Sequence, residues 1–392
     1  MNIVLITEGF PCSPSEPYLE CEINYLAKYF DTVFIVHKST LNDPYIELES
    51  NVSFIRYNNS KMKISDLFFY FKLSEIFNEI KSIKFKVLKF NFSFIKIILK
   101  FYYDAIKFSS FIKKLPDNSI YYNYWTDFPT LGCILAKKKT ISRFHGYDVY
   151  FERHPFNYLP FRDKIFNNLL IASFISKDGE NYTKRKFKIQ NSKVNSLGLK
   201  SKNAFLPFKS NKYLHIVSCS DLIELKNIDK IISAISKIKI LKVKWTHIGG
   251  GLLFDKLYKL AKINFKENIT FEFTGKISNL EVIHFYKNNY VDLFLNLSST
   301  EGIPYTFMEA NSFSIPVIAP NIGGVSEIVT NENGYLLSNN PTPKYVAKMI
   351  CRYYNMSFKE KNHKRLSAYN TWFEKFNAEK NYSEFAEDIL SL

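Results

Sequence analysis

The chain has 392 residues, of which 46% are hydrophobic, and a formal net charge of +16 at pH 7. That length exceeds what one hydrophobic core usually organises, so it excludes a single small domain and predicts two folded domains. The apolar runs are broken by lysines well short of the roughly 20 residues that a bilayer span needs. A strand pattern begins at residue 2 without a preceding basic segment, so we expect neither a signal peptide nor a transmembrane helix.

The five cysteines are scattered, odd in number and without any C-x-x-C pair. This pattern argues against a disulfide framework and against a zinc site, and it is typical of a reducing compartment. We therefore expect a cytoplasmic protein.

Positive charge is concentrated between residues 61 and 114, which hold twelve lysines and four acids, a net charge of +8. Aromatic and aliphatic residues between these lysines predict two or three amphipathic helices. Such helices suit an anionic membrane surface, and we expect a peripheral contact with the inner face of the cytoplasmic membrane. The alternative is that the apolar faces are core and the lysines form a solvated rim. No nucleic-acid-binding module accompanies the basic residues, so we do not expect a nucleic-acid partner.

Short apolar runs alternate with helical patterns along both halves of the chain, and this alternation predicts βαβ units and parallel sheets. The fold class is therefore α/β, with two doubly wound, Rossmann-like domains. Predicted strands lie at residues 3–6, 33–36, 120–124, 141–144 and 169–174 in the first half, and at 214–218, 243–248, 269–273 and 291–297 in the second.

Residues 292–335 carry the most informative pattern, DLFLNLSSTEGIPYTFMEANSFSIPVIAPNIGGVSEIVTNENGY. It indicates a strand, a glycine-bearing loop, a helix at 306–313, a second strand, a glycine pair and another helix. Ligands of parallel sheets bind where such loops lead into helix N-termini, which suit phosphate. Seven residues separate Glu301 in the loop from Glu309, whose carboxylate is suited to a ribose diol. The alternative is a solvated loop and a surface glutamate.

Part of this stretch resembles the E-x7-E signature of a family of retaining glycosyltransferases with the GT-B fold, often called family 4 or glycosyl transferases group 1. The matching segments are EGIPYTFMEA, then IPVIAPNIGGVSEIV and NGYLL. CSDLIELKNIDKIISA and RFHGYDVYFE resemble two further segments of that family. The resemblance covers nearly the whole chain, most strongly residues 213–340 and most weakly residues 38–118. It implies two Rossmann-like domains that face a central cleft.

The implied organisation is an acceptor-side domain over residues 1–200, a linker over 201–212 and a nucleotide-sugar-binding domain over 213–370. Residues 371–392 are predicted to form one helix, which resembles the family's helix that crosses back to the first domain. A core helix of the second domain is equally compatible with the sequence.

The resemblance implies a role for each matched residue. Glu309 binds ribose, Lys226 begins a helix and grips the diphosphate together with the backbone of 302–306, and Glu301 faces the sugar hydroxyls. His145 lines the sugar pocket, so His145 and Glu301 are the predicted catalytic residues. The predicted donor-binding residues are Lys226, Gly249, Gly250, Gly302, Ile303, Pro304, Tyr305, Thr306 and Glu309.

Gly9 and Asp148 are expected on the acceptor side, although Asp148 would equally cap a local turn. The loop at residues 249–251 could equally serve only to turn the chain. Two departures from the family pattern stand out. Asp221 occupies a position where many members have an arginine, and Gly9 stands alone where many have a glycine pair.

The expected reaction moves a sugar with retention from a nucleotide-diphosphate sugar to a glycan or lipid-linked glycan. The expected setting is bacterial surface polysaccharide biosynthesis, which covers O-antigen, capsule and exopolysaccharide. Neither a cofactor nor a metal is expected, because the chain has no Asp-x-Asp cluster to hold a metal. Two alternatives remain open: a nucleotide-sugar epimerase of the same fold, and a non-catalytic partner or scaffold, which Asp221 and the missing glycine pair favour.

Overall fold

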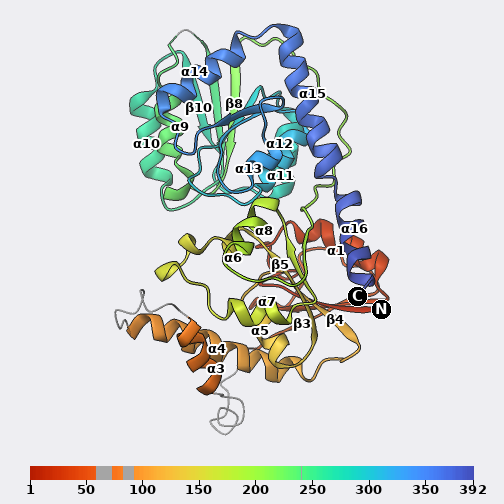
Figure 1. The fold of residues 1–392 in the computed structure, drawn as a ribbon. Helices are drawn as coiled ribbons and strands as arrows, with labels where there is room; N and C mark the ends of the chain where they lie inside the picture. Colours follow the sequence, from red (N-terminus) through yellow and green to blue (C-terminus); the bar gives the residue numbers. More distant parts are fainter. Residues whose placement is uncertain (59–72, 83–91, 240) are drawn as a thin grey trace. The chain divides into compact units, whose positions relative to one another are not determined.

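The structure, a computed structural model, describes residues 1–58, 73–82, 92–239 and 241–392. It divides into two compact units. Unit 1 comprises Met1–Ser196 and Tyr382–Leu392, and unit 2 comprises Leu197–Asn381. Each unit is built on one parallel sheet flanked by helices (Figure 1), so the predicted fold class of two doubly wound α/β domains is confirmed.

The sheet of unit 1 has seven parallel strands in the order β3-β2-β1-β4-β5-β6-β7. The strand order reverses between β1 and β4, which pair in the register Ile3↔Ile120. The strands are β1 (Asn2–Ile6), β2 (Thr32–His37), β3 (Val52–Arg56), β4 (Ser119–Asn123), β5 (Lys139–Phe144), β6 (Ile171–Phe174) and β7 (Ser192–Val194). All five residues of β4 are buried, as expected for a strand covered on both faces.

The helices of unit 1 are α1 (Leu19–Tyr29), α3 (Leu73–Ser82), α4 (Phe92–Ile112), α5 (Phe128–Leu135), α6 (Gly146–Val149), α7 (Arg162–Asn168) and α8 (Lys177–Lys184), with the short 3-10 helices η2 (Phe151–Arg153) and η3 (Pro155–Asn157). Ser176 caps α8, because its hydroxyl accepts a hydrogen bond from the Gly179 N–H. Helices α3 and α4 fall within the predicted basic helices. The rest of that prediction, residues 61–72 and 83–91, lies outside the described residues.

Helix α4 has one face in the core of unit 1. Phe94, Ile98 and Tyr102 are buried, whereas Phe92 on the same helix is 90% exposed. The core-facing side agrees with the reading in which these helices cover the sheet. The exposed side leaves the membrane reading open. Among the described residues, no helix is both long and apolar enough to span a bilayer.

The sheet of unit 2 has six parallel strands in the order β10-β9-β8-β11-β12-β13, with the reversal between β8 and β11. The strands are β8 (Leu214–Cys219), β9 (Val243–Ile248), β10 (Ile269–Phe273), β11 (Leu293–Leu295), β12 (Val317–Pro320) and β13 (Gly334–Leu337). The helices are α9 (Ile228–Ile235), α10 (Phe254–Asn264), α11 (Asn279–Asn288), α12 (Tyr305–Ser312), α13 (Val325–Ile328), α14 (Pro343–Tyr354) and α15 (Phe358–Lys375), with the 3-10 helix η4 (Glu224–Lys226).

The stretch predicted as the linker belongs to unit 2 and is tied to it by hydrogen bonds. Arg365 is 1% exposed, and its guanidinium donates to the carbonyls of Leu206 at 2.8 Å and Val291 at 2.9 Å. The Leu206 N–H donates to the hydroxyl of Ser314 at 2.9 Å. These bonds satisfy backbone groups that an extended segment would otherwise leave to water.

The C-terminal stretch differs from the single helix predicted over residues 371–392. Helix α15 ends at Lys375, and a second helix, α16, spans Ala378–Leu390. The break occurs where Leu199 bonds to the chain: its N–H donates to the Phe376 carbonyl at 2.9 Å. Phe376 has φ −129° and ψ 24°, which no α-helix accommodates.

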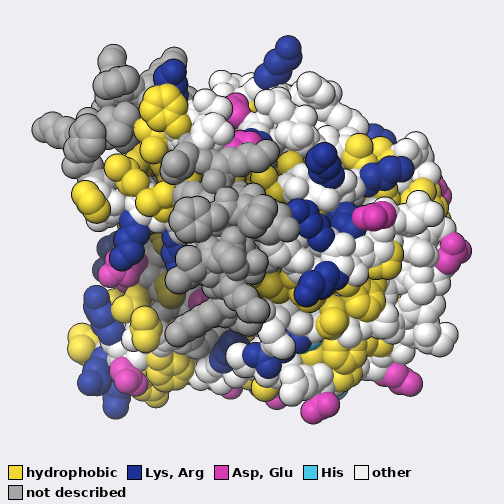
Figure 2. Space-filling view, turned by 90° about the horizontal axis from the view of Figure 1, so that it is seen from below, with side chains coloured by type: hydrophobic (Ala, Val, Ile, Leu, Met, Phe, Trp, Pro, Cys, Tyr) yellow, Lys and Arg dark blue, Asp and Glu magenta, His cyan; other side chains and the backbone are white. Residues whose placement is uncertain are grey.

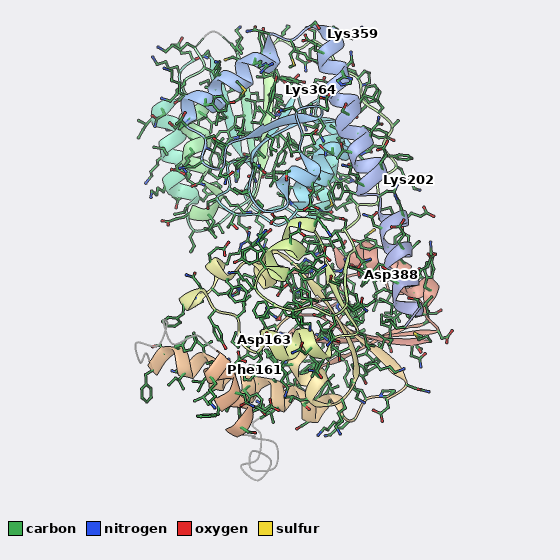
Figure 3. All side chains as sticks on the ribbon, viewed as in Figure 1. Phe161, Asp163, Lys202, Lys359, Lys364 and Asp388 are labelled. Carbon is green, nitrogen blue, oxygen red and sulfur yellow. The ribbon has the colours of Figure 1, made fainter. Side chains whose placement is uncertain are left out.

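The end of α16 belongs to unit 1. Phe385, Ala386 and Ile389 share a buried cluster with Ile3 and Leu5 of β1. Asp388 (Figure 3) accepts hydrogen bonds from Lys193 at 2.5 Å and from the Asn195 amide at 2.8 Å. The chain therefore returns from unit 2 to unit 1 within α16.

Candidate active site

The candidate site in unit 2 lies where the strand order reverses, at the carboxyl ends of β8 and β11. Loops from these two strands are bonded to each other. The Ser299 N–H donates to the Leu225 carbonyl at 2.8 Å, and the Asn227 amide donates to the Leu297 carbonyl at 2.8 Å. Because ligands of open parallel sheets bind at such reversals, this is the expected place for a phosphate-bearing ligand.

The two loops bring together Lys226 and Glu301, two residues that sequence analysis assigned to different parts of the ligand. The Lys226 ammonium lies 2.6 Å from a Glu301 carboxylate oxygen. The Glu301 side chain is 11% exposed and that of Lys226 is 24% exposed. An anionic ligand would therefore compete with Glu301 for the ammonium.

Lys226 does not begin a helix, contrary to the prediction. It is the last residue of η4, and α9 starts two residues later. Asn227 separates the two helices because it has φ 49° and ψ 42°, a left-handed conformation that Asn adopts more readily than most residues. Asp221, which occupies the position where many family members have an arginine, lies in this same loop, and its side chain is exposed.

Glu309 lies inside α12 and is almost completely buried, at 2% exposure. One carboxylate oxygen accepts a hydrogen bond from the Asn279 amide at 2.5 Å. Burial raises the pKa of Glu309 to about 7, and the bond from Asn279 opposes that rise. At neutral pH this carboxyl is therefore poised between its protonated and ionised forms.

Asn279 is a site residue that sequence analysis missed. It is the first residue of α11, whose N-cap Ser278 forms a capping box with Glu281. The capping box is readable in the sequence as a helix start. No local signal places that helix start against Glu309, which is 30 residues away along the chain.

Helix α12 starts one residue earlier than predicted, at Tyr305, with Pro304 in the N-cap position at φ −67°. The stretch from Gly302 to Thr306 leads directly into this helix, and Ile303 is 5% exposed. The Gly302 carbonyl accepts a hydrogen bond from the Gly324 N–H at 3.1 Å, which fixes the loop against the glycine pair. The first N–H groups of a helix have no partner within the helix, and its dipole favours an anion there.

The loop at Gly249 and Gly250 has a structural explanation that needs no ligand. Gly249 has φ 140°, and a Cβ there would lie 1.9 Å from the Ser220 carbonyl oxygen. The Gly250 carbonyl accepts a hydrogen bond from the Leu222 N–H at 2.8 Å. The loop thus turns the chain tightly against the segment that follows β8, and a role in donor binding stays a prediction.

His145 follows β5 in unit 1 and is 6% exposed. Its Nε2 lies 3.1 Å from the Tyr124 carbonyl, and its ring lies 4.3 Å from the Trp125 ring. Burial, assisted by the charge of Arg143, lowers the pKa of His145 to about 3, so the ring is neutral at pH 7. Since a carbonyl can only accept, Nε2 carries the proton and Nδ1 is left as the acceptor.

The Asp148 carboxylate accepts a hydrogen bond from the His145 N–H at 3.1 Å. This is the local-turn role that the sequence left open. Burial raises the pKa of Asp148 to about 7, and the charge of Arg162 opposes the rise.

Gly9 lies in a loop that is organised by Glu16, a residue outside the predicted site. The Glu16 carboxylate is 1% exposed and accepts hydrogen bonds from the N–H groups of Glu8, Gly9 and Phe10 at 3.1, 2.7 and 3.0 Å. It also accepts one from the Trp125 indole at 2.6 Å. The N–H of Gly9 is therefore already committed within the protein.

Within the described parts of the chain, no group of three or more His, Cys, Asp or Glu side chains is arranged to hold a metal ion. The expectation that the reaction needs no metal stays a prediction.

Comparison with known proteins matches most of unit 2 to a described family. Residues 201–371 match the family model of glycosyl transferases group 1. Two Escherichia coli proteins, the O-antigen biosynthesis glycosyltransferase WbnH and the probable O-antigen biosynthesis glycosyltransferase WbiN, are each 34% identical to this chain over 92 residues. That match spans 24% of this chain and 24% of each relative. The chain therefore aligns with about a quarter of the length of these curated relatives.

Similar solved structures cover the whole chain. Sucrose-phosphate synthase from Thermosynechococcus elongatus has a TM-score of 0.72 at 17% identity. The alignment covers 100% of this chain and 98% of the synthase chain. Anabaena HepE in complex with UDP and glucose has a TM-score of 0.68 at 14% identity and covers 100% of both chains. At these identities the likeness shows the fold alone. Residues 201–371 thus form a glycosyl transferases group 1 domain within a chain of the GT-B fold.

Proposed function

We propose that the protein is a retaining glycosyltransferase of family 4 type. It would move a sugar from a nucleotide-diphosphate sugar to a glycan or lipid-linked glycan in bacterial surface polysaccharide biosynthesis. The observation that carries this proposal is the gathering of Lys226, Glu301 and Glu309 in the group 1 domain, around the strand-order reversal. The O-antigen role of WbnH supports the proposed pathway, and the UDP and glucose bound to HepE support the proposed donor class.

In this proposal each residue meets a different part of the donor. The buried carboxylate of Glu309 accepts hydrogen bonds from the ribose hydroxyls. The Lys226 ammonium and the first N–H groups of α12 bind the diphosphate. Glu301, released from Lys226 as the diphosphate binds, accepts hydrogen bonds from the sugar hydroxyls.

The chemical task is departure of the diphosphate, so charge on its oxygens must be stabilised as the bond to the sugar breaks. Lys226 and the α12 backbone supply that stabilisation. The acceptor hydroxyl attacks from the same face and gives its proton to the leaving phosphate, which preserves the anomeric configuration. His145 would contact the transferred sugar as a neutral ring, because its depressed pKa excludes an acid role near pH 7. Neither a metal nor another cofactor takes part in the proposed reaction.

A thermal-shift panel of UDP- and GDP-sugars tests the donor class. A ligand that binds only the folded state stabilises it by about 2.7 kcal/mol at a concentration 100 times its Kd. We expect one nucleotide class to raise the unfolding temperature, and sugar transfer to require an added glycan acceptor. An epimerase would isomerise the donor without an acceptor, and a non-catalytic scaffold would give no shift with any donor.

We further propose that α3 and α4 touch an anionic membrane surface. Phe77 and Phe92 are 60% and 90% exposed, and lysines lie between such apolar residues. An apolar groove of about 450 Å³ on α4 is lined by Phe92, Ile95, Leu99 and Tyr103 together with Lys96 and Lys100. Figure 2 shows hydrophobic and basic side chains exposed on the same face of unit 1. Apolar insertion with a basic border is the pattern of helices that lie in a membrane interface.

For this surface we expect sedimentation with vesicles that contain an anionic lipid and little with purely zwitterionic vesicles. Binding should weaken as salt rises from about 0.05 to 0.5 M, because screening shortens the range of the lysine charges. Lys96→Glu should reduce binding, whereas Lys262→Glu, the same change on exposed α10, should not. Binding that is indifferent to lipid charge would favour the solvated-rim reading.

A further inference from the structure

Unit 1 contains a cavity of about 630 Å³, within the size range of small-molecule sites. It lies beyond the carboxyl ends of β1 and β4, where the strand order of unit 1 reverses. Much of its wall is aromatic, with Phe101, Trp125, Phe128, Tyr147 and Tyr158 among the lining residues. Tyr147 is 58% exposed, and its ring lies 4.3 Å from that of His154. The cavity thus presents flat rings to whatever enters it.

The cavity wall also includes a buried cation. Arg162 is 4% exposed, and one of its terminal nitrogens donates to the Asp148 carbonyl at 3.2 Å. Its Nε and its other terminal nitrogen have no hydrogen-bond partner among the described residues. Both nitrogens are themselves buried, so Arg162 supplies positive charge to this wall rather than open hydrogen-bond donors.

Asp127 supplies an acceptor on the same wall. It occupies the N-cap position of α5, yet its side chain makes no capping hydrogen bond. Asp at this position normally accepts a bond from the helix backbone. Here the carboxylate is left available to a ligand, close enough to Arg162 for their charges to interact.

The charges around the cavity disfavour an anionic ligand. Its lining acids, Glu8, Asp104, Asp127 and Asp148, outnumber its two permanent cations. One of those cations, Lys100, already pairs with Asp104 at 2.8 Å. The nearby N–H groups of residues 8–10, a geometry that suits a phosphate, are filled by the Glu16 carboxylate.

We propose that this cavity binds an uncharged sugar ring at the end of the acceptor, an inference that rests on the proposed glycosyltransferase function. The ring's apolar face would lie against Tyr147 and Trp125. Its hydroxyls would donate to the Asp127 carboxylate, which makes no capping hydrogen bond within the protein. The acceptor class is therefore a glycan that ends in a neutral sugar rather than in a phosphorylated or carboxylated one.

Saturation-transfer NMR on the full chain tests this assignment. The neutral probes are the methyl glycosides of glucose, galactose and N-acetylglucosamine, and the charged probes are glucose 6-phosphate and glucuronic acid. We expect at least one neutral glycoside to bind and both charged sugars to bind more weakly. The same glycoside should protect Trp125 from acrylamide quenching, since the other two tryptophans, Trp245 and Trp372, are 0% and 2% exposed.

Variants locate the binding within unit 1. Tyr147→Ala and Asp127→Asn should each weaken glycoside binding by about fivefold or more, the effect of losing one stacking or hydrogen-bonding contact. Tyr345→Ala removes a tyrosine of similar exposure, 43%, on α14 of unit 2 and should bind as the unaltered chain does.

Three results would overturn the inference: no neutral glycoside binds, the charged sugars bind more tightly, or both unit 1 variants bind normally. UDP- and GDP-sugar thermal shifts measured on the same samples keep the two proposals separate. A donor shift without glycoside binding removes only the acceptor assignment. Glycoside binding without any donor shift removes the proposed transferase function instead.

Discussion

Replacing Glu309 with alanine is expected to weaken nucleotide-sugar binding by about 100-fold. The carboxylate is 2% exposed, so in the proposed complex its hydrogen bonds to a ribose diol form away from water. Two charge-assisted bonds at such a site together account for about 3 kcal/mol, which corresponds to that change in Kd. Isothermal titration with the nucleotide sugar identified in the thermal-shift panel measures the loss.

The control is Glu374→Ala, which removes an exposed glutamate from α15 of the same unit. It should bind the donor as the unaltered chain does. Normal donor affinity in Glu309→Ala, with a native circular dichroism spectrum, would show that Glu309 does not hold the ribose.

The pH dependence of the same residue follows from its pKa of about 7, which burial raises from 4.5. The folded chain holds this proton more tightly than the unfolded chain. The resulting stability is therefore fully present below pH 4.5 and is lost as pH rises through about 7. A shift of this size corresponds to about 3 kcal/mol.

Donor binding should have the opposite trend, because only the ionised carboxylate accepts from both hydroxyls. Affinity should rise between about pH 6 and pH 8. Glu309→Gln should flatten this rise and should be more stable than the unaltered chain at pH 8 when no ligand is present. Equal pH profiles for the two proteins would contradict the assignment.

Replacing Lys226 with alanine is expected to lower kcat/KM for transfer by about 10²–10³-fold. This is the usual effect of removing one group that stabilises charge developing on oxygen in a transition state. Because the charge develops as the diphosphate leaves, the loss should appear mainly in kcat rather than in KM. Steady-state transfer rates with saturating acceptor measure it, and Lys237→Ala, an exposed lysine shortly after α9, is the control.

The ion pair between Lys226 and Glu301 leads to a second prediction, on the Glu301 side chain. Because Glu301 holds the Lys226 ammonium at 2.6 Å, Glu301→Gln should release it and strengthen binding of the free nucleotide diphosphate. The same change should reduce kcat if Glu301 contacts the transferred sugar. A Lys226→Ala variant with normal kcat would remove Lys226 from the chemistry.

Local residue patterns were sufficient to predict most of the architecture. Apolar runs such as residues 214–218 and 243–248 correspond closely to β8 and β9, and their alternation with helices implied parallel sheets. Pro304 and the helical spacing after it located α12 to within one residue. These features are readable because buried strands and helix starts depend on residues close together in the chain.

Residue patterns alone were therefore enough to predict the α/β class and the candidate positions of Glu301 and Glu309. Three contacts became visible only in the folded chain: Lys226 pairs with Glu301, Asn279 bonds to Glu309, and Leu199 bonds to the C-terminal stretch where its helix breaks. Folding also placed Asp127, which makes no capping hydrogen bond, and the buried Arg162 in the wall of one cavity. The physical reason is that each of these contacts joins segments far apart in the chain, and local residue patterns carry no information about which distant segments the packing of the sheet brings together.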